Sequence, residues 1–155
     1  MVMDEIDMKI LDILQEDAKT PYYKIAEKLE IGTTTVHSRI QKMIRERIIE
    51  KFSVVIDYEK LGYDAFVVIG LSVEPDKIDE VAKKIAEYDE VQMVGVTTGS
   101  HDMVIELLGK DTKTIGKFIN EKIKTIKGVR LTPGSMDVSF FTDMYKHAHG
   151  IKLVR

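Results

Sequence analysis

The segment DAFVVIGLSVEP, residues 64–75, is rich in apolar and β-branched side chains and is typical of a strand buried in a sheet. An amphipathic helix that ends near Tyr88 is expected next, because apolar residues recur at helical spacing from Ile78 to Ile85. A strand followed by a helix that covers it is one unit of a layered domain. The residues that follow decide which domain this is.

The strand and helix patterns then recur. EVQMVGVTT at 90–98 and DMVIELLG at 102–109 are two more strand patterns, joined by a three-residue turn. An apolar stripe over 115–126 predicts a second helix, and a last strand is expected from Gly128. The order βαββαβ predicts a ferredoxin-like domain, a four-stranded antiparallel sheet with both helices on one face. Pro133 fits this topology, because the last strand lies at a sheet edge, where proline is tolerated.

The first strand is apolar on both faces. Val67, Ile69 and Leu71 alternate with Phe66 and Val68, although the helices of this topology cover only one face. Burying apolar surface stabilises by about 25 cal/mol per Å², so a second subunit is the expected cover of the other face. We therefore expect a homodimer or a larger homo-oligomer.

Three short helices are predicted before this domain. The first carries an apolar stripe over residues 6–14 and the second carries one over 22–29. Thr20 is expected to cap the second helix, with Pro21 at its first helical position. After the turn sequence EIG, the third helix is expected over residues 33–45.

The third helix has hydroxyl groups where most surface helices carry Glu, Lys and Ala. Val36, Ile40, Met43 and Ile44 predict its buried side, and either Gly32 or Thr33 serves as its cap. A helix, a short turn and a polar-faced helix predict a helix-turn-helix, whose second helix enters the DNA major groove. A small helical bundle whose threonines merely begin a helix is the alternative. The residues predicted to contact DNA are Thr33, Thr34, Thr35, His37, Ser38, Arg39, Gln41, Lys42 and Arg45.

The distribution of charge favours the DNA-binding interpretation. The whole chain has a net charge of -3, which argues against a protein that coats nucleic acid everywhere. Residues 1–31 hold four Lys against eight Asp and Glu, whereas residues 32–51 hold five Lys and Arg against two Glu. The third helix therefore begins the most basic segment of its domain.

These patterns divide the chain into two domains with a connector. Residues 1–51 are predicted to be a helix-turn-helix domain, and residues 64–155 a ferredoxin-like domain for effector binding and oligomerisation. Residues 52–63 connect them, and the β-branched segment around Phe52–Ile56 predicts a strand there. The fold class is therefore α+β.

The composition excludes several kinds of chemistry. Without cysteine, the chain has no disulfide, no thiolate zinc site and no cysteine nucleophile. His147 and His149 stand two residues apart with no carboxylate or cysteine nearby, so we assign neither a metal nor a cofactor. No apolar run approaches the roughly 18 residues that span a bilayer, and the acidic N-terminus is unlike a signal peptide, so we expect a cytoplasmic protein without a membrane partner.

Three stretches resemble the Lrp/AsnC family, the feast/famine regulators of prokaryotes that include leucine-responsive and asparagine-responsive regulators. DEIDMKILDILQEDAKTPYYKIAEKL (4–29), TTTVHSRIQKMIRERIIEKFSVVIDYEKLGY (33–63) and TTGSHDMVIEL (97–107) carry the resemblance. It implies a transcription regulator, not an enzyme, that binds double-stranded DNA and senses an amino acid or related metabolite, with dimers that often assemble to octamers. Two positions differ from the family pattern: Glu30 replaces a common glycine, and Gly32 replaces a serine that often caps the recognition helix.

The resemblance also places the effector between dimers, near the turn that joins the second and third strands. In this chain the turn consists of Thr98, Gly99, Ser100, His101 and Asp102. Gly99 lets backbone N–H groups approach a ligand carboxylate, and Asp102 offers a charge partner for an α-ammonium group. Ordinary hairpin chemistry, with Asp102 bonding its own backbone, explains the same residues without a ligand.

Two other functions stay open. Sirohaem decarboxylases of haem biosynthesis resemble the same two-domain family, and His101 would then be a catalytic candidate beside a tetrapyrrole pocket. The basic, hydroxyl-rich third helix argues against that enzyme. The other alternative is a metabolite-binding module whose vestigial helix-turn-helix only mediates assembly.

Overall fold

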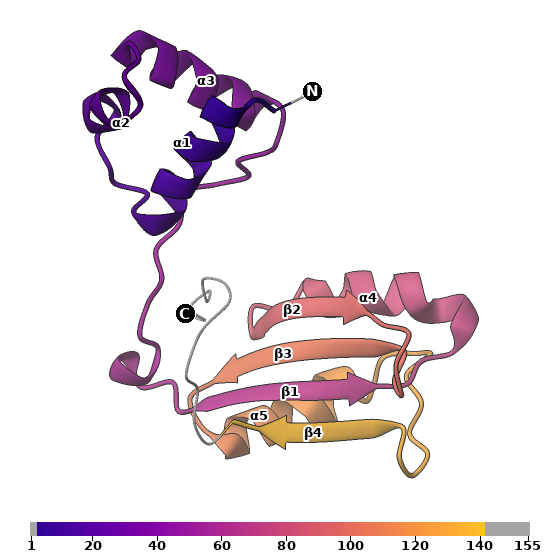
Figure 1. Ribbon diagram of the computed structural model, residues 1–155. Coiled ribbons are helices and arrows are strands. Elements are labelled where there is room, and N and C mark those ends of the chain that lie inside the picture. Colours follow the sequence, from indigo (N-terminus) through magenta and orange to yellow (C-terminus); the bar gives the residue numbers. More distant parts are fainter. Residues whose placement is uncertain (1–2, 142–155) are drawn as a thin grey trace. The chain divides into compact units, whose positions relative to one another are not determined.

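The computed structural model describes residues 3–141 of the 155-residue chain. Two compact units divide it, one up to Val54 and one from Val55 onward, and Figure 1 shows a helical unit followed by a unit built on a sheet. Within residues 3–141, no helix is long and apolar enough to cross a membrane. His147 and His149 lie outside the described residues.

The first unit is a three-helix domain made of α1 (Glu5–Glu16), α2 (Tyr22–Leu29) and α3 (Thr33–Arg45). A capping box begins α1: the Asp4 carboxylate accepts the Asp7 N–H at 2.9 Å, and the Asp7 carboxylate accepts the Asp4 N–H at 3.3 Å. The predicted apolar stripes of the three helices meet in one core. Its fully buried members are Ile10, Ile25, Val36, Ile40 and Met43.

The turn between α2 and α3 depends on an unusual backbone conformation. Glu30 has φ 54° and ψ 40°, the left-handed region in which glycine is favoured. Gly32 is the N-cap of α3, one of the two expected caps. The prediction that Thr20 caps α2 is wrong: its hydroxyl donates to the Asp17 carbonyl at 2.8 Å, and Pro21 is the N-cap rather than the first helical residue.

The second unit is the predicted ferredoxin-like domain. Its strands β1 (Ala65–Leu71), β2 (Val91–Val96), β3 (Met103–Gly109) and β4 (Met136–Phe140) are ordered β2-β3-β1-β4, with every neighbouring pair antiparallel. The helices α4 (Ile78–Ala86) and α5 (Thr112–Phe118) pack on one side of this sheet (Figure 1). A π-helical segment at Ile119–Ile123 continues α5, so the regular helix is shorter than the predicted 115–126.

The two faces of β1 are covered differently. Val67, Ile69 and Leu71 are fully buried under the helices. On the opposite face Phe66 is buried as well, because the Tyr58 ring stacks on it with 5.9 Å between ring centroids. The chain therefore covers one end of this face itself, whereas Val68 further along remains partly exposed.

Two predicted strands differ from the structure. The last strand begins at Met136 rather than at Gly128, because Gly128 and Gly134 adopt positive φ values of 99° and 78° that interrupt an extended chain. Val129 forms only an isolated bridge to Val73, and Pro133 precedes the edge strand β4 instead of lying in it. Phe52–Ile56 forms no strand, since the described part of this single chain gives it no strand to pair with.

Candidate functional sites

The polar face of α3 is exposed, as its sequence predicts. Val36, Ile40 and Met43 are buried in the core of the first unit, and this orients the opposite side of α3 to solvent. Ile44, the fourth residue of the predicted apolar stripe, is 36% exposed. The exposed side therefore presents hydroxyls, an imidazole, an amide and cations together. Its exposed residues are Thr33, Thr34, Thr35, His37, Ser38, Lys42 and Arg45, and Gln41 is partly buried among them.

Tyr22, at the start of α2, supports one of these side chains. Its ring lies 5.9 Å from the His37 ring between centroids, with the planes tilted by 57°. This contact restricts the exposed imidazole from one side. Sequence reasoning assigned Tyr22 only to the apolar stripe of α2.

Arg39 differs from the other predicted DNA contacts. Its Nη1 atom donates to Asp4 Oδ2 and to Asp7 Oδ1, both at 2.7 Å. These bonds raise the pKa of Arg39 above its ordinary value, and the bond to Asp7 has the larger effect. The pKa of Asp4 is lowered, first by the Asp7 N–H and then by Arg39. The guanidinium therefore bonds to the start of α1 in the same unit.

The predicted effector turn is held at three points. The Thr97 hydroxyl donates to the His101 carbonyl at 2.5 Å, and the Thr97 N–H donates to the Asp102 carbonyl at 2.9 Å. Asp102 Oδ2 accepts the N–H of Val73, a residue just beyond β1, at 2.9 Å. Asp102 therefore bonds backbone of another segment, and Thr98, Gly99 and Ser100 form the exposed tip.

The His101 ring of this turn lies against the face of the sheet opposite the helices. A Cβ added to Gly70 would lie only 2.8 Å from His101 Nδ1, so the imidazole occupies the space that glycine leaves on β1. Ser100 Oγ is 3.2 Å from Nδ1, and Asp137 Oδ2 on β4 is 3.5 Å from Nε2. Nε2 is buried and has no hydrogen-bond partner in the described part of the chain.

Gly70 and Asp137 reach this turn through strand pairing. They stand opposite each other in the register of β1 and β4, and sequence reasoning missed both. A signal for Gly70 was present, because a glycine inside an apolar strand often marks a close approach. Among residues 3–141, no group of three or more His, Asp or Glu side chains is placed to hold a metal ion.

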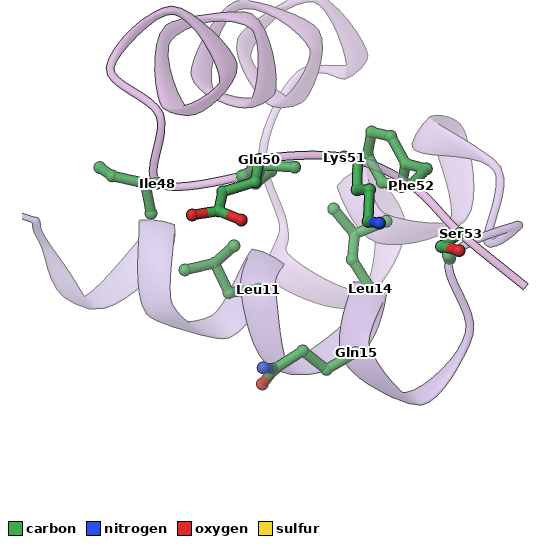
Figure 2. Close-up of a pocket in the computed structure, with 10 residues that line it drawn as sticks. Leu11, Leu14, Gln15, Ile48, Glu50, Lys51, Phe52 and Ser53 are labelled. Carbon is green, nitrogen blue, oxygen red and sulfur yellow. The ribbon is translucent and has the colours of Figure 1, made fainter. Parts of the chain in front are cut away.

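A separate groove of about 400 Å³ lies in the first unit. Figure 2 shows Leu11 and Leu14 of α1 pointing across it toward the segment that contains Ile48 and Phe52. Neither α3 nor the turn at 98–102 contributes to its lining. The groove therefore coincides with neither predicted site. Its lining residues are Leu11, Leu14, Gln15, Ala18, Ile48, Ile49, Glu50, Lys51, Phe52 and Ser53.

Comparison with known proteins finds a matching domain family for each of the two units. Residues 3–44 match the AsnC-type helix-turn-helix domain, and residues 65–147 match the Lrp/AsnC ligand binding domain. An uncharacterized HTH-type transcriptional regulator of Pyrococcus furiosus is 38% identical over 87% of this chain and 91% of its own length.

Two solved structures share the fold over most of this chain's length. E. coli AsnC is 23% identical and has a TM-score of 0.85, with 96% of this chain and 98% of that chain covered. The regulator NMB0573 of Neisseria meningitidis, solved as a complex with L-Met, is 20% identical and has a TM-score of 0.84, with 94% of each chain covered. At these identities the likeness supports the fold alone.

The chain therefore belongs to the Lrp/AsnC family of HTH-type transcriptional regulators, with a DNA-binding helix-turn-helix domain followed by a small-molecule ligand-binding domain. This confirms the resemblance seen in its sequence. The relative from P. furiosus is named a transcriptional regulator, which argues against the sirohaem-decarboxylase alternative.

Proposed function

We propose that the chain is a sequence-specific regulator that reads DNA with α3 and whose DNA binding or assembly responds to an amino acid or related metabolite. The observation that carries this proposal is the exposed face of α3, in a unit that matches an AsnC-type helix-turn-helix. Hydroxyl and amide groups suit the donors and acceptors on base edges, and cations suit phosphates. Ser38 and Gln41 are the proposed base contacts, and Lys42 and Arg45 the proposed phosphate contacts. Thr33, Thr34, Thr35 and His37 complete the interface.

The proposed effector site is the turn from Thr98 to Asp102. Gly99 and Ser100 are exposed, and their backbone N–H groups are the proposed donors to a ligand carboxylate. Asp102 uses Oδ2 for Val73, and its Oδ1 is the proposed partner of the ammonium group. The unpartnered Nε2 of His101 supplies one more polar atom beside the turn. The L-Met complex of the Neisseria meningitidis regulator supports an amino acid as the ligand class.

We further propose a homodimer that assembles to an octamer, in which a second subunit covers the open face of the sheet. The partly exposed Val68 and Val104 on that face support this assembly, although Tyr58 already covers Phe66 beside them. A regulator that binds prokaryotic DNA acts in the cytoplasm, which is the proposed location. An effector between subunits shifts assembly only if it binds one state better than another.

One experiment tests DNA binding and sensing together: selection of bound duplexes from a random pool, with and without a panel of amino acids that includes methionine. We expect one enriched motif, altered in strength or form by one class of amino acid. Ser38→Ala is expected to change the motif, because base contacts discriminate between sequences. Lys42→Ala is expected to weaken binding to all sequences and lower the salt slope by about one.

Two outcomes would contradict the proposal. If neither variant changes binding, α3 is not the recognition helix. If the wild-type protein enriches no motif but binds amino acids in calorimetry, the helix-turn-helix is vestigial and the chain is a metabolite-binding module.

A further inference from the structure

Arg39 links the middle of α3 to the start of α1, across 32 and 35 residues of sequence. Its Nη1 atom donates one hydrogen to Asp7 and one to Asp4, each at 2.7 Å. The Asp7 side chain is 9% exposed and the Arg39 side chain 27% exposed, so this contact is partly shielded from solvent. The interaction is a directional bond between two helices, unlike the exposed ion pairs within single helices.

The two carboxylates that receive Arg39 are themselves fixed. Asp4 and Asp7 form the capping box of α1, so the carboxylate of each also accepts the backbone N–H of the other. Otherwise α1 and α3 meet through apolar side chains such as Ile10 and Ile40. Apolar packing is not directional, whereas charge-assisted hydrogen bonds are, so the bonds of Arg39 to a fixed anchor add a directional restraint on α3 to that packing.

Charge balance keeps Arg39 at this position. If its guanidinium moved to a DNA phosphate, Asp7, whose side chain is only 9% exposed in this structure, would lose its cation, and an unpaired charge with little access to solvent is unfavourable. Asp4 would lose the same partner. Lys42 and Arg45, by contrast, are exposed on the same helix and remain the proposed phosphate contacts.

We infer that Arg39 is a positioning residue, which holds α3 at a fixed orientation through Asp4 and Asp7, and is not a contact to DNA. The inference rests on the proposed function, because it concerns how α3 reads a duplex. It replaces the sequence-based prediction that Arg39 belongs to the DNA-contacting set.

The test measures affinity for the selected duplex against salt concentration in full-length wild type, Asp4→Asn, Arg39→Gln and the control Lys42→Gln. Asparagine caps a helix as well as aspartate does, so Asp4→Asn keeps the start of α1 and removes only a charge partner of Arg39. If charge alone mattered, removing a negative charge would tighten DNA binding. Positioning predicts the opposite sign, a weakening of about three- to tenfold.

The salt slope separates positioning from phosphate contact. We expect Arg39→Gln to weaken binding in parallel at all salt concentrations, with the wild-type slope, and Lys42→Gln to lower the slope by about one. Melting curves show whether each variant is folded, and Asp4→Asn decides the question if Arg39→Gln does not fold.

A slope lowered by about one in Arg39→Gln, or tighter binding by Asp4→Asn, overturns the inference while leaving the proposed function in place. A wild-type protein that binds no duplex overturns both.

Discussion

Asp102→Ala removes the acceptor of a buried backbone donor. Asp102 Oδ2 accepts the Val73 N–H at 2.9 Å, and Val73 is fully buried, so this N–H loses its protein acceptor in a position with little access to solvent. Leaving such a donor unpaired costs about 1–3 kcal/mol. We therefore expect Asp102→Ala to lower the unfolding free energy of the second unit by about 2 kcal/mol.

A loss of this size is readily measured by circular dichroism during heating. In a domain of up to about 100 residues, each kcal/mol lowers the melting temperature by about 4–8 °C, so Asp102→Ala is expected to melt about 8–16 °C below wild type. Asp102→Asn is the matched control, because its amide oxygen accepts the same N–H and only the charge is lost. The control is expected to melt within about 4 °C of wild type.

The same control isolates the proposed role of Asp102 in effector binding. A folded Asp102→Asn protein lacks the anion for the ammonium group, and losing one charge-assisted bond weakens amino-acid binding about tenfold or more in calorimetry. A wild-type melting temperature in Asp102→Ala would refute the reasoning about Val73. Wild-type amino-acid affinity in Asp102→Asn would place the ammonium group elsewhere.

Three further variants test other parts of the structure. Glu30→Gly relieves the left-handed backbone and is expected to stabilise the first unit by about 1 kcal/mol in urea denaturation; destabilisation would show that the glutamate side chain outweighs its backbone strain. Gly70→Ala places a Cβ 2.8 Å from His101 Nδ1 and therefore displaces the imidazole beside the proposed effector turn, so calorimetry is expected to find weaker amino-acid binding. Gly95→Ala is the control, because its Cβ meets only Met93 Sδ at 3.4 Å. Because the pKa of Asp4 is lowered in the folded state, its stabilising contribution is present above the unfolded pKa of about 3.9 and is lost as pH falls through the folded pKa. The melting-temperature deficit of Arg39→Gln should therefore shrink between pH 5 and pH 2, and a constant deficit would show that the ion pair with Asp4 contributes nothing.

Local sequence patterns predicted most of the elements of this fold. The stripes around Ile10 and Ile40 placed α1 and α3, because helical spacing is a property of neighbouring residues. The pattern failed where a strand depends on a distant partner. Phe52–Ile56 has strand propensity but no strand to pair with in the described chain, and Val129 lies in a loop because Gly128 turns the backbone.

In the candidate sites too, features set by neighbouring residues could be predicted, and features set by distant contacts could not. The exposed face of α3 followed from the positions of Val36 and Met43 in the helical repeat. The partners of Arg39 could not be predicted from the sequence, because they depend on how α3 crosses a helix more than 30 residues earlier. The contact of the His101 ring with Gly70 likewise depends on how the turn folds back over the sheet.

The three anchors of the turn at 97–102 have a thermodynamic consequence for any ligand that binds there. The two bonds of Thr97 and the Asp102–Val73 bond hold the ends of the turn in the folded chain, so part of the conformational entropy of this segment is already lost before a ligand arrives. Association then meets little opposition from loop ordering, and even a small metabolite with few contacts can bind usefully. For such a ligand, differences in affinity are expected mainly in its rate of dissociation.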